Sequence, residues 1–359
     1  MSKRKIKVNK KVKLIALVLV VLAIATTLFF VFGGNKNENT SSKNNKKGES
    51  KPVKVEEKIN IIDTTSNKRP FAIMINNLAV ARQMHSGLQD AYIIYEMIVE
   101  GGITRYMAIF ESDKQVDKIG PVRSSRHYYL DYVKENDAIY VHNGYSPQAG
   151  ADFGNLGIDR IEAEAPKTGI RWNPKGLARE HTLFTNTELL NKNGVGKKRT
   201  ELNKNVGRLL KYSAKSVELD KKTGAIIANN ITIPYSKGTT TSYTYDPENK
   251  VYKRFVNGTA HTDYITKNQY TFKNIITYKV KNNNIVSPDG YNGRQEIHNI
   301  GSGTGYYISE GYAVPIKWSK ESRTAQTKYT YEDGTELKVN DGNTFIQIQP
   351  ADRELTIAE

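Results

Sequence analysis

The chain has 359 residues, a formal net charge of +16 and no cysteine. This length suffices for two ordinary domains with appendages, and the lack of cysteine excludes disulfide bonds and a lipid-modified cysteine. Residues 1–13 contribute +7 and residues 35–58 contribute +3, which leaves only +6 on residues 59–359. The folded part is therefore mildly basic, so we expect no nucleic-acid binding, and the basic leader favours anionic lipid or wall polymer.

Residues 14–32 form an apolar run in which only Thr26 and Thr27 are polar. As a helix this run is roughly 28 Å long, about the thickness of a bilayer core. Seven basic residues and no acid precede it. The positive-inside rule then predicts a cytoplasmic segment 1–13, a single-pass signal-anchor helix 14–32 and extracytoplasmic domains. A cleaved secretory signal is the alternative, but its apolar core is usually only about 7–15 residues long.

Residues 33–58 are rich in Asn, Lys, Ser and Glu and contain no aromatic residue. Such a segment buries too little apolar surface to fold, so we predict a disordered tether. An α/β domain is expected over 59–215. From about residue 216, Tyr- and Thr-rich strands alternate with turn dipeptides such as Asn257-Gly258 and Asp333-Gly334. This pattern predicts a β-rich domain over 216–359, an antiparallel sandwich or barrel.

The stretch from Glu96 to His142 holds the candidate polar site. Two apolar runs, 95–100 and 103–110, flank Gly101-Gly102, which predicts a hairpin with a two-residue turn. That register places Glu96, Glu100 and Arg105 on one face of the hairpin. They form either a half-buried ion-pair cluster that pins the hairpin or part of a ligand site.

A second motif, Gly120-Pro121-Val122-Arg123-Ser124-Ser125-Arg126, precedes a predicted helix over 127–135. With Ser124 or Ser125 as N-cap, the two arginines would flank a helix N-terminus suited to a carboxylate or phosphate. Alternatively, Arg123 and Arg126 pair with Glu96, Glu100 or Asp131.

Two histidines complete the set of candidates. His142 ends a predicted buried strand over 138–142, and Ser146-Pro147 then begins a helix as N-cap and first residue. Open α/β sheets bind ligands at such strand ends. His181 begins a further predicted strand, and a short helix is expected from Thr187. The candidate ligand-binding residues are thus Glu96, Glu100, Arg105, Arg123, Ser124, Arg126, His142 and His181.

These motifs resemble the YerB-like lipoprotein family of Gram-positive bacteria, a domain of unknown function (3048) with N- and C-terminal parts. The resemblance runs from about Arg69 to Pro350 and is carried by the Glu-Gly-Gly and Gly-Pro-Val-Arg-Ser stretches, by 142–149, by 245–254 and by 341–346. It implies a two-domain, membrane-bound extracytoplasmic protein, with no reaction and no catalytic residues. The chain departs from the family in lacking the lipidated cysteine and in its Arg82-Gln83-Met84-His85 segment, where an Arg-Pro stretch is expected.

The sequence therefore predicts a membrane-anchored module that binds or scaffolds a wall component or a membrane protein of wall synthesis. The alternative is an enzyme acting on a wall polymer or small anionic substrate, with Glu96 or Glu100 as acid or base, His142 or His181 as proton shuttle and the arginines as an anion clamp. We find no nucleophile elbow, metalloprotease, Walker or dinucleotide motif. Glu100, His142 and His181 match no local metal motif, so we expect no metal and no cofactor.

Overall fold

The computed structural model describes residues 58–359, which belong to one compact unit. The predicted cytoplasmic segment, anchor helix and nearly all of the tether lie outside these residues. Within residues 58–359, no helix has the length and apolar character needed to cross a bilayer.

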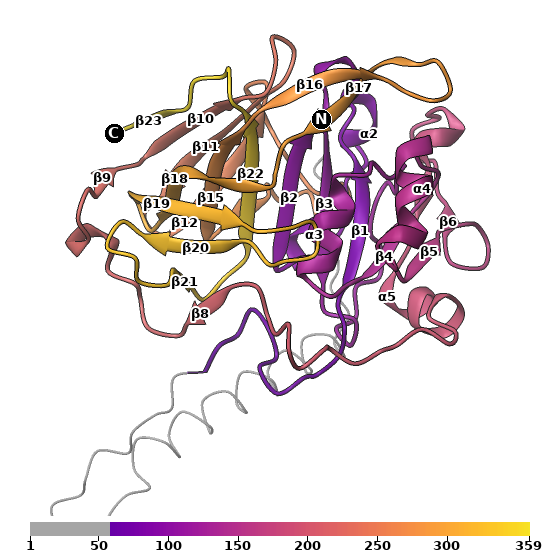
Figure 1. Ribbon diagram of the computed structural model, residues 1–359, viewed down its shortest axis with the longest axis horizontal. Helices are drawn as coiled ribbons and strands as arrows, with labels where there is room; N and C mark the ends of the chain where they lie inside the picture. Colours follow the sequence, from indigo (N-terminus) through magenta and orange to yellow (C-terminus); the bar gives the residue numbers. More distant parts are fainter. Residues whose placement is uncertain (1–57) are drawn as a thin grey trace, which may run out of the picture. The chain divides into compact units, whose positions relative to one another are not determined.

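The core of the protein is a mixed sheet of eleven strands (Figure 1). Its order is β20-β19-β18-β15-β22-β2-β3-β1-β4-β5, and β9 pairs with β19 at the side. The bounds of these strands are β1 Phe71–Asn76, β2 Ile93–Ile98, β3 Thr104–Phe110, β4 Ile139–His142, β5 Arg160–Glu162, β9 Ile226–Ile227, β15 Asn274–Val280, β18 Gly301–Ser309, β19 Tyr312–Lys320, β20 Lys328–Tyr331 and β22 Thr344–Pro350.

The strands β1, β2 and β3 are buried at every residue. Near-continuous apolar runs such as 71–75 suit a sheet covered on both faces, which confirms the predicted strands there and over β4. β1 pairs in parallel with β4 and β4 with β5, whereas β3 pairs antiparallel with both β1 and β2. The first half of the chain therefore contributes the mixed end of the sheet.

A second sheet has six strands, and all its pairings are antiparallel. The turn dipeptide Asn257-Gly258 falls between two of its strands, as predicted. It consists of β10 Asn230–Pro234, β11 Thr240–Asp246, β12 Val251–Val256, β13 Thr259–Ala260, β14 Thr271–Phe272 and β23 Thr356–Ala358. The remaining strands form three two-stranded sheets: β6 Ile170–Arg171 with β7 Leu183–Phe184, β8 Lys211–Ser213 with β21 Lys338–Asn340, and β16 Asn282–Val286 with β17 Asn292–Ile297.

Within residues 58–359, the α-helices are short and all end before residue 190. Ser146 caps the longest one by accepting a hydrogen bond from the backbone N–H of Ala149, and Pro147 is its first residue, as predicted. The helices are α2 Ala79–Arg82, α3 Tyr129–Glu135, α4 Pro147–Asn155 and α5 Thr187–Leu189, with a π-helical turn over Leu190–Gly194 and 3-10 turns over Leu88–Asp90, Glu100–Gly102, Arg179–His181 and Leu219–Lys221.

The two halves of the chain share the large sheet. β22, close to the C-terminus, lies between β2 and β15 and pairs in parallel with both. Figure 1 shows this yellow strand beside the indigo β2. The mixed α/β region and the antiparallel β region, expected as 59–215 and 216–359, are thus joined edge to edge by continuous backbone hydrogen bonding.

Candidate functional site

The hairpin of β2 and β3 has a three-residue loop, Glu100–Gly102, instead of the predicted two-residue turn. Both glycines adopt a left-handed φ, +66° and +71°, and Gly102 packs against the side chain of Ser236. The extra residue shifts the register by one, so that Ile98 pairs with Thr104 and Met97 with Arg105. Because a one-residue shift moves a strand's side chains to the other face, the predicted grouping of Glu96 with Arg105 is wrong.

Glu96 lies in the core between the two sheets. Its carboxylate accepts hydrogen bonds from the Nη2 of Arg254 at 2.8 Å and from the hydroxyl of Thr104 at 2.6 Å. The hydroxyl of Thr241 contacts the same carboxylate. The side chains of Glu96 and Arg254 are both 0 % exposed. Glu96 is therefore a structural anion, out of reach of solvent.

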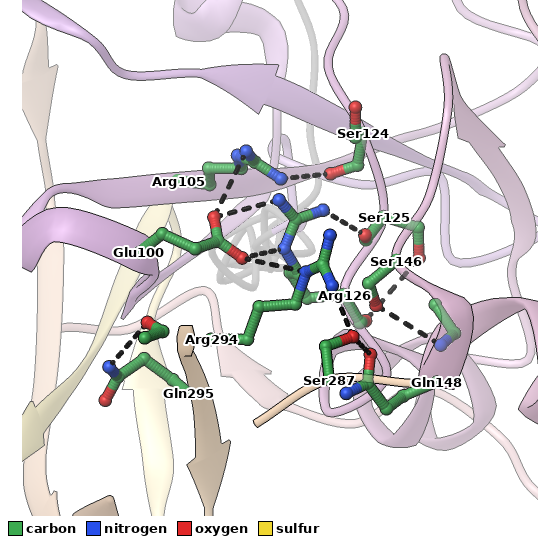
Figure 2. Close-up of polar contacts among 12 residues, drawn as sticks. Glu100, Arg105, Ser124, Ser125, Arg126, Ser146, Gln148, Ser287, Arg294 and Gln295 are labelled. Atoms are coloured by element: carbon green, nitrogen blue, oxygen red, sulfur yellow. Dashed lines mark hydrogen bonds and ion pairs between the residues drawn. The ribbon is translucent and has the colours of Figure 1, made fainter. Parts of the chain in front are cut away.

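Glu100 is the centre of an arginine cluster on the face of the β2–β3 hairpin opposite to Glu96 (Figure 2). Arg126 binds both of its carboxylate oxygens, Arg105 Nη2 lies 3.5 Å from Oε2 and Arg294 Nε lies 4.0 Å from Oε1. All four side chains are at most 14 % exposed. Burial alone raises the pKa of Glu100, but its hydrogen bond with Arg126 and the charges of Arg126 and Arg105 hold that pKa below its usual value. Of the predicted ion-pair cluster, the structure places Glu100 beside Arg105 but not beside Glu96, and it adds Arg126 and Arg294.

The cluster joins three segments that are distant in the sequence. Arg105 Nη1 donates to the carbonyl of Ser124 at 2.7 Å, and Arg126 Nη1 donates to the carbonyl of Ser125 at 2.6 Å. Arg294 comes from β17 and also binds Ser287 and Asp289. Arg294 could not be predicted from the sequence, because it belongs to no motif and pairs with a residue far away in the chain.

The predicted anion site at a helix N-terminus does not form. α3 begins at Tyr129, its N-cap is Tyr128, and no side chain caps it. Ser125 instead accepts a hydrogen bond from the hydroxyl of Tyr140 at 2.8 Å. Arg126 pairs with Glu100, one of the acids expected for it, whereas Arg123 lies 3.3 Å from Glu180, which was not among them.

The two candidate histidines are separate from the arginine cluster. His142 ends β4 as predicted, is 0 % exposed and stacks on Phe153 with ring centroids 5.1 Å apart. Burial lowers its pKa to about 4. His181 accepts a hydrogen bond at Nδ1 from the side-chain amide of Asn76 at 2.9 Å, in the tautomer that suits this contact. Its pKa is also lowered, chiefly by burial.

Within residues 58–359, no group of three or more His, Asp or Glu side chains is placed to hold a metal ion. Glu100, His142 and His181 lie on three different elements and have three different sets of partners. Within the described part of the chain, these three residues therefore do not come together as a metal site of two histidines and one carboxylate.

A cleft of ≈ 560 Å³ lies beside the arginine cluster, between α3, α4 and the β16–β17 ribbon. Arg323 bridges Asp131 at 2.7 Å and Asp152 at 2.8 Å, and His127 Nε2 lies 2.9 Å from Glu296. Burial raises the pKa of Asp131. The cleft thus presents charges of both signs. Its lining is His127, Tyr128, Asp131, Pro147, Gln148, Ala151, Asp152, Pro288, Glu296, Ile297, His298, Asn299, Ile300 and Arg323.

The cleft adjoins the arginine cluster through Gln148 and Ser287. Gln148 on the cleft wall accepts a hydrogen bond from the hydroxyl of Ser287, and Ser287 also binds Arg294 of the cluster. Figure 2 shows these side chains side by side. Residues of both halves of the chain therefore build one polar region.

The fold and the site define a two-sheet α/β protein whose polar cleft is built by both halves of the chain. Residues 59–201 match the N-terminal domain, and residues 231–346 the C-terminal domain, of "Protein of unknown function (DUF3048)". The chain belongs to this family.

The sequence and the crystal structure of one relative, YerB of Bacillus subtilis, agree with this assignment. The chain is 27 % identical over 302 residues to the "Putative lipoprotein YerB" of Bacillus subtilis, covering 83 % of this chain and 84 % of that protein. The crystal structure of the YerB protein from the same organism superposes with a TM-score of 0.68 at 25 % identity, covering 83 % of this chain and 97 % of that one.

Proposed function

We propose that this protein is a membrane-associated extracytoplasmic binding module that holds a wall component or a membrane partner in the cleft beside the arginine cluster. The observation that carries the proposal is the cleft itself. It is open, about 560 Å³ in volume, and lined by carboxylates, an arginine and histidines from both halves of the chain. Such a mixture suits a ligand that carries both amines and carboxylates, as wall peptides do.

The proposed location at the membrane is supported by the name of the Bacillus subtilis relative and by the N-terminal sequence of this chain. The matched Bacillus subtilis protein is described as a lipoprotein in its name, which supports a place on the outer side of the membrane. This chain has no cysteine to carry a lipid, so we propose residues 14–32 as its single-pass anchor. Deleting residues 1–34 should move the protein from the membrane fraction to the soluble fraction. Retention in the membrane fraction would contradict the anchor.

The enzymatic alternative has weaker geometric support. Glu96 lies on the opposite face of the hairpin from Arg105 and is fully enclosed with Arg254. Glu100 already has arginine partners. Neither carboxylate is paired with His142, which contacts the backbone carbonyl of Gly144 and the side chain of Arg160. A general acid or base has to reach the proton it transfers, and this arrangement favours binding.

The test is retention of the full chain, in a neutral detergent, on purified peptidoglycan, on wall polymer and on immobilised membrane-protein extract. Glu296, which is 39 % exposed at the cleft, is changed to Lys. The matched control is Glu248→Lys in an exposed turn between β11 and β12. We expect wild type and control to be retained on one matrix and Glu296→Lys to lose most of its binding. Equal retention of the two variants, or no retention on any matrix, would contradict the proposal.

A further inference from the structure

A second pocket, also of ≈ 560 Å³, lies between α2, the loop at 171–179 and the loops around β13. It shares no lining residue with the cleft described above. α2 is followed by the Arg82-Gln83-Met84-His85 segment in which this chain departs from the family pattern. The departure therefore lies at the wall of a pocket.

Three cationic side chains from three separate segments line this pocket: Arg82, Lys175 and Lys267. Arg82 Nη1 donates to the backbone carbonyl of Asn77 at 2.9 Å, and Lys175 Nζ donates to Gln83 at 3.2 Å. Lys267 lies over the ring of Tyr264, 3.8 Å from its centroid. Among residues 58–359, none of the three cations forms an ion pair with a carboxylate, in contrast to the arginines around Glu100.

Asp263 is the one acidic residue in the pocket lining, and its oxygens face the protein. Oδ2 accepts hydrogen bonds from the backbone N–H of Gly87 at 2.8 Å and from the hydroxyl of Tyr270 at 2.9 Å. Oδ1 accepts from the backbone N–H groups of Ile265 and Thr266. Because this carboxylate already accepts four hydrogen bonds from the protein, it does not pair with the three cations, and they can bind a ligand.

The floor of the pocket is neutral. His261 accepts at Nδ1 from Arg254 at 2.8 Å, and its Nε2 lies 2.7 Å from Nδ1 of His85, whose Nε2 donates to the carbonyl of Asn76. In this chain of hydrogen bonds, each imidazole ring uses one nitrogen as a donor and the other as an acceptor. Only the neutral form of histidine has one donor and one acceptor, so both rings are neutral. The charge of Arg254 is balanced by Glu96. A ligand in the pocket would therefore meet net positive charge from the rim alone.

One wall of the pocket is aromatic. Tyr264 packs edge-to-face on Trp172, with ring centroids 5.3 Å apart. Lys118 Nζ lies over the ring of Trp172, 3.6 Å from its centroid. An aliphatic or sugar portion of a ligand could pack on Tyr264 while its charged group meets the cations.

We propose that this pocket binds a phosphate ester. A phosphodiester carries one negative charge on two non-bridging oxygens of a tetrahedral phosphorus, so cations can approach it from directions outside a single plane, whereas a carboxylate is planar. The three cations here come from three segments, and the same lining includes Tyr264 for contact with the esterified alcohol. The ligand would be either a phosphodiester polymer or a phospholipid head group, which share this chemistry. The inference goes beyond the cleft and is independent of it.

The test is isothermal titration calorimetry of the full chain in a neutral detergent that contains no phosphate group, at low salt. The probes are a glycerol phosphate oligomer, the short-chain lipid dihexanoyl phosphatidylglycerol, and uncharged glycerol as a blank. We expect one of the two phosphate probes to bind, and to bind at least tenfold more weakly to Lys175→Gln/Lys267→Gln. Both lysines are exposed, so this variant should fold. Arg82→Gln, whose hydrogen bonds to Asn77 are lost, is a second variant with its thermal midpoint measured alongside.

The matched control is Lys192→Gln/Lys197→Gln, which removes two exposed charges elsewhere and should change the affinity less than twofold. Binding of the oligomer alone or of the lipid alone supports the proposal and identifies the source of the phosphate. Failure of both probes to bind overturns it. An equal loss in the pocket and control variants also overturns it, because it would indicate nonspecific attraction to a basic chain.

Discussion

Glu96 on β2 and Arg254 on β12 form a fully buried ion pair, with 2.8 Å between Oε2 and Nη2. A second such pair joins Glu135 of α3 to Lys320 of β19 at 2.7 Å, with side chains 0 % and 1 % exposed. In each pair the acid comes from the first half of the chain and the base from the second. The folded state therefore needs both halves for electrostatic reasons as well as for its sheet.

The first prediction concerns Glu96→Gln. Removing one partner of a buried pair leaves the other charge uncompensated, which typically costs about 3–5 kcal/mol. We expect the free energy of unfolding, measured by denaturant titration, to fall by about that amount. Glu248→Gln in an exposed turn should change it by less than about 0.5 kcal/mol. A similar small effect for Glu96→Gln would show that the pair contributes little.

The second prediction concerns the two halves expressed alone, as residues 58–215 and 216–359. Without β22, strand β2 loses its parallel neighbour, and Glu96 and Glu135 lose their buried partners. We expect each half to lack dispersed amide chemical shifts in NMR spectra, and co-expression of both halves to restore them. A well-dispersed spectrum from either half alone would contradict this expectation.

The third prediction concerns acid. Burial lowers the pKa of His85 to about 3 and that of His261 well below its usual value. Since an unfolded histidine titrates near 6.5, only the unfolded state takes up these protons as the pH falls below that value. Stability is therefore fully present above about pH 6.5 and decreases as the pH falls toward 3, by up to about 1.4 kcal/mol per pH unit for each histidine.

The measurement is the free energy of unfolding at several pH values between 7 and 5, above the range where most carboxylates titrate. His85→Gln should flatten this pH dependence even if it lowers stability overall. The exposed His298 provides the control, since His298→Gln should leave the slope unchanged. An unchanged slope in His85→Gln would show that His85 is protonated in the folded state.

The fourth prediction compares two adjacent glycines in the loop after β2. Both have positive φ, so alanine at either position should cost about 1 kcal/mol through backbone strain. A methyl group at Gly101 would meet nothing within 4 Å, whereas one at Gly102 would lie 2.9 Å from Cβ of Ser236. We expect Gly102→Ala to cost a further ~1–3 kcal/mol in thermal or denaturant unfolding. Equal effects would mean that Ser236 moves aside freely.

The fifth prediction concerns Glu100→Gln in the arginine cluster. Its side chain is 12 % exposed, so the loss of its charge should destabilise the protein by about 2 kcal/mol, less than the loss at the fully buried Glu96. Because the pKa of Glu100 is lowered in the folded state, its contribution is present above the unfolded value near 4.3 and is lost as the pH falls through the folded pKa. The free energies of unfolding of wild type and Glu100→Gln, measured at decreasing pH, should therefore converge at low pH.

The sequence by itself determined the local features of this protein. Buried strands at 71–76 and 139–142, the Ser146 cap of α4 and the strand-and-turn pattern after residue 216 all depend on neighbouring residues. Apolar runs, caps and turn dipeptides are local signals, and they also carried the family resemblance. His142 was correctly placed at a strand end for the same reason.

Only the tertiary structure decided which charges meet. The register of the β2–β3 hairpin depended on one loop residue, and that residue separated Glu96 from Arg105. The partner of Glu96 is 158 residues away in the chain, and Arg294 reaches Glu100 from a distant ribbon. Long-range contacts of this kind arise when β22 enters the middle of the large sheet and the two sheets stack. No local pattern specifies them, because they form only when the whole chain has folded.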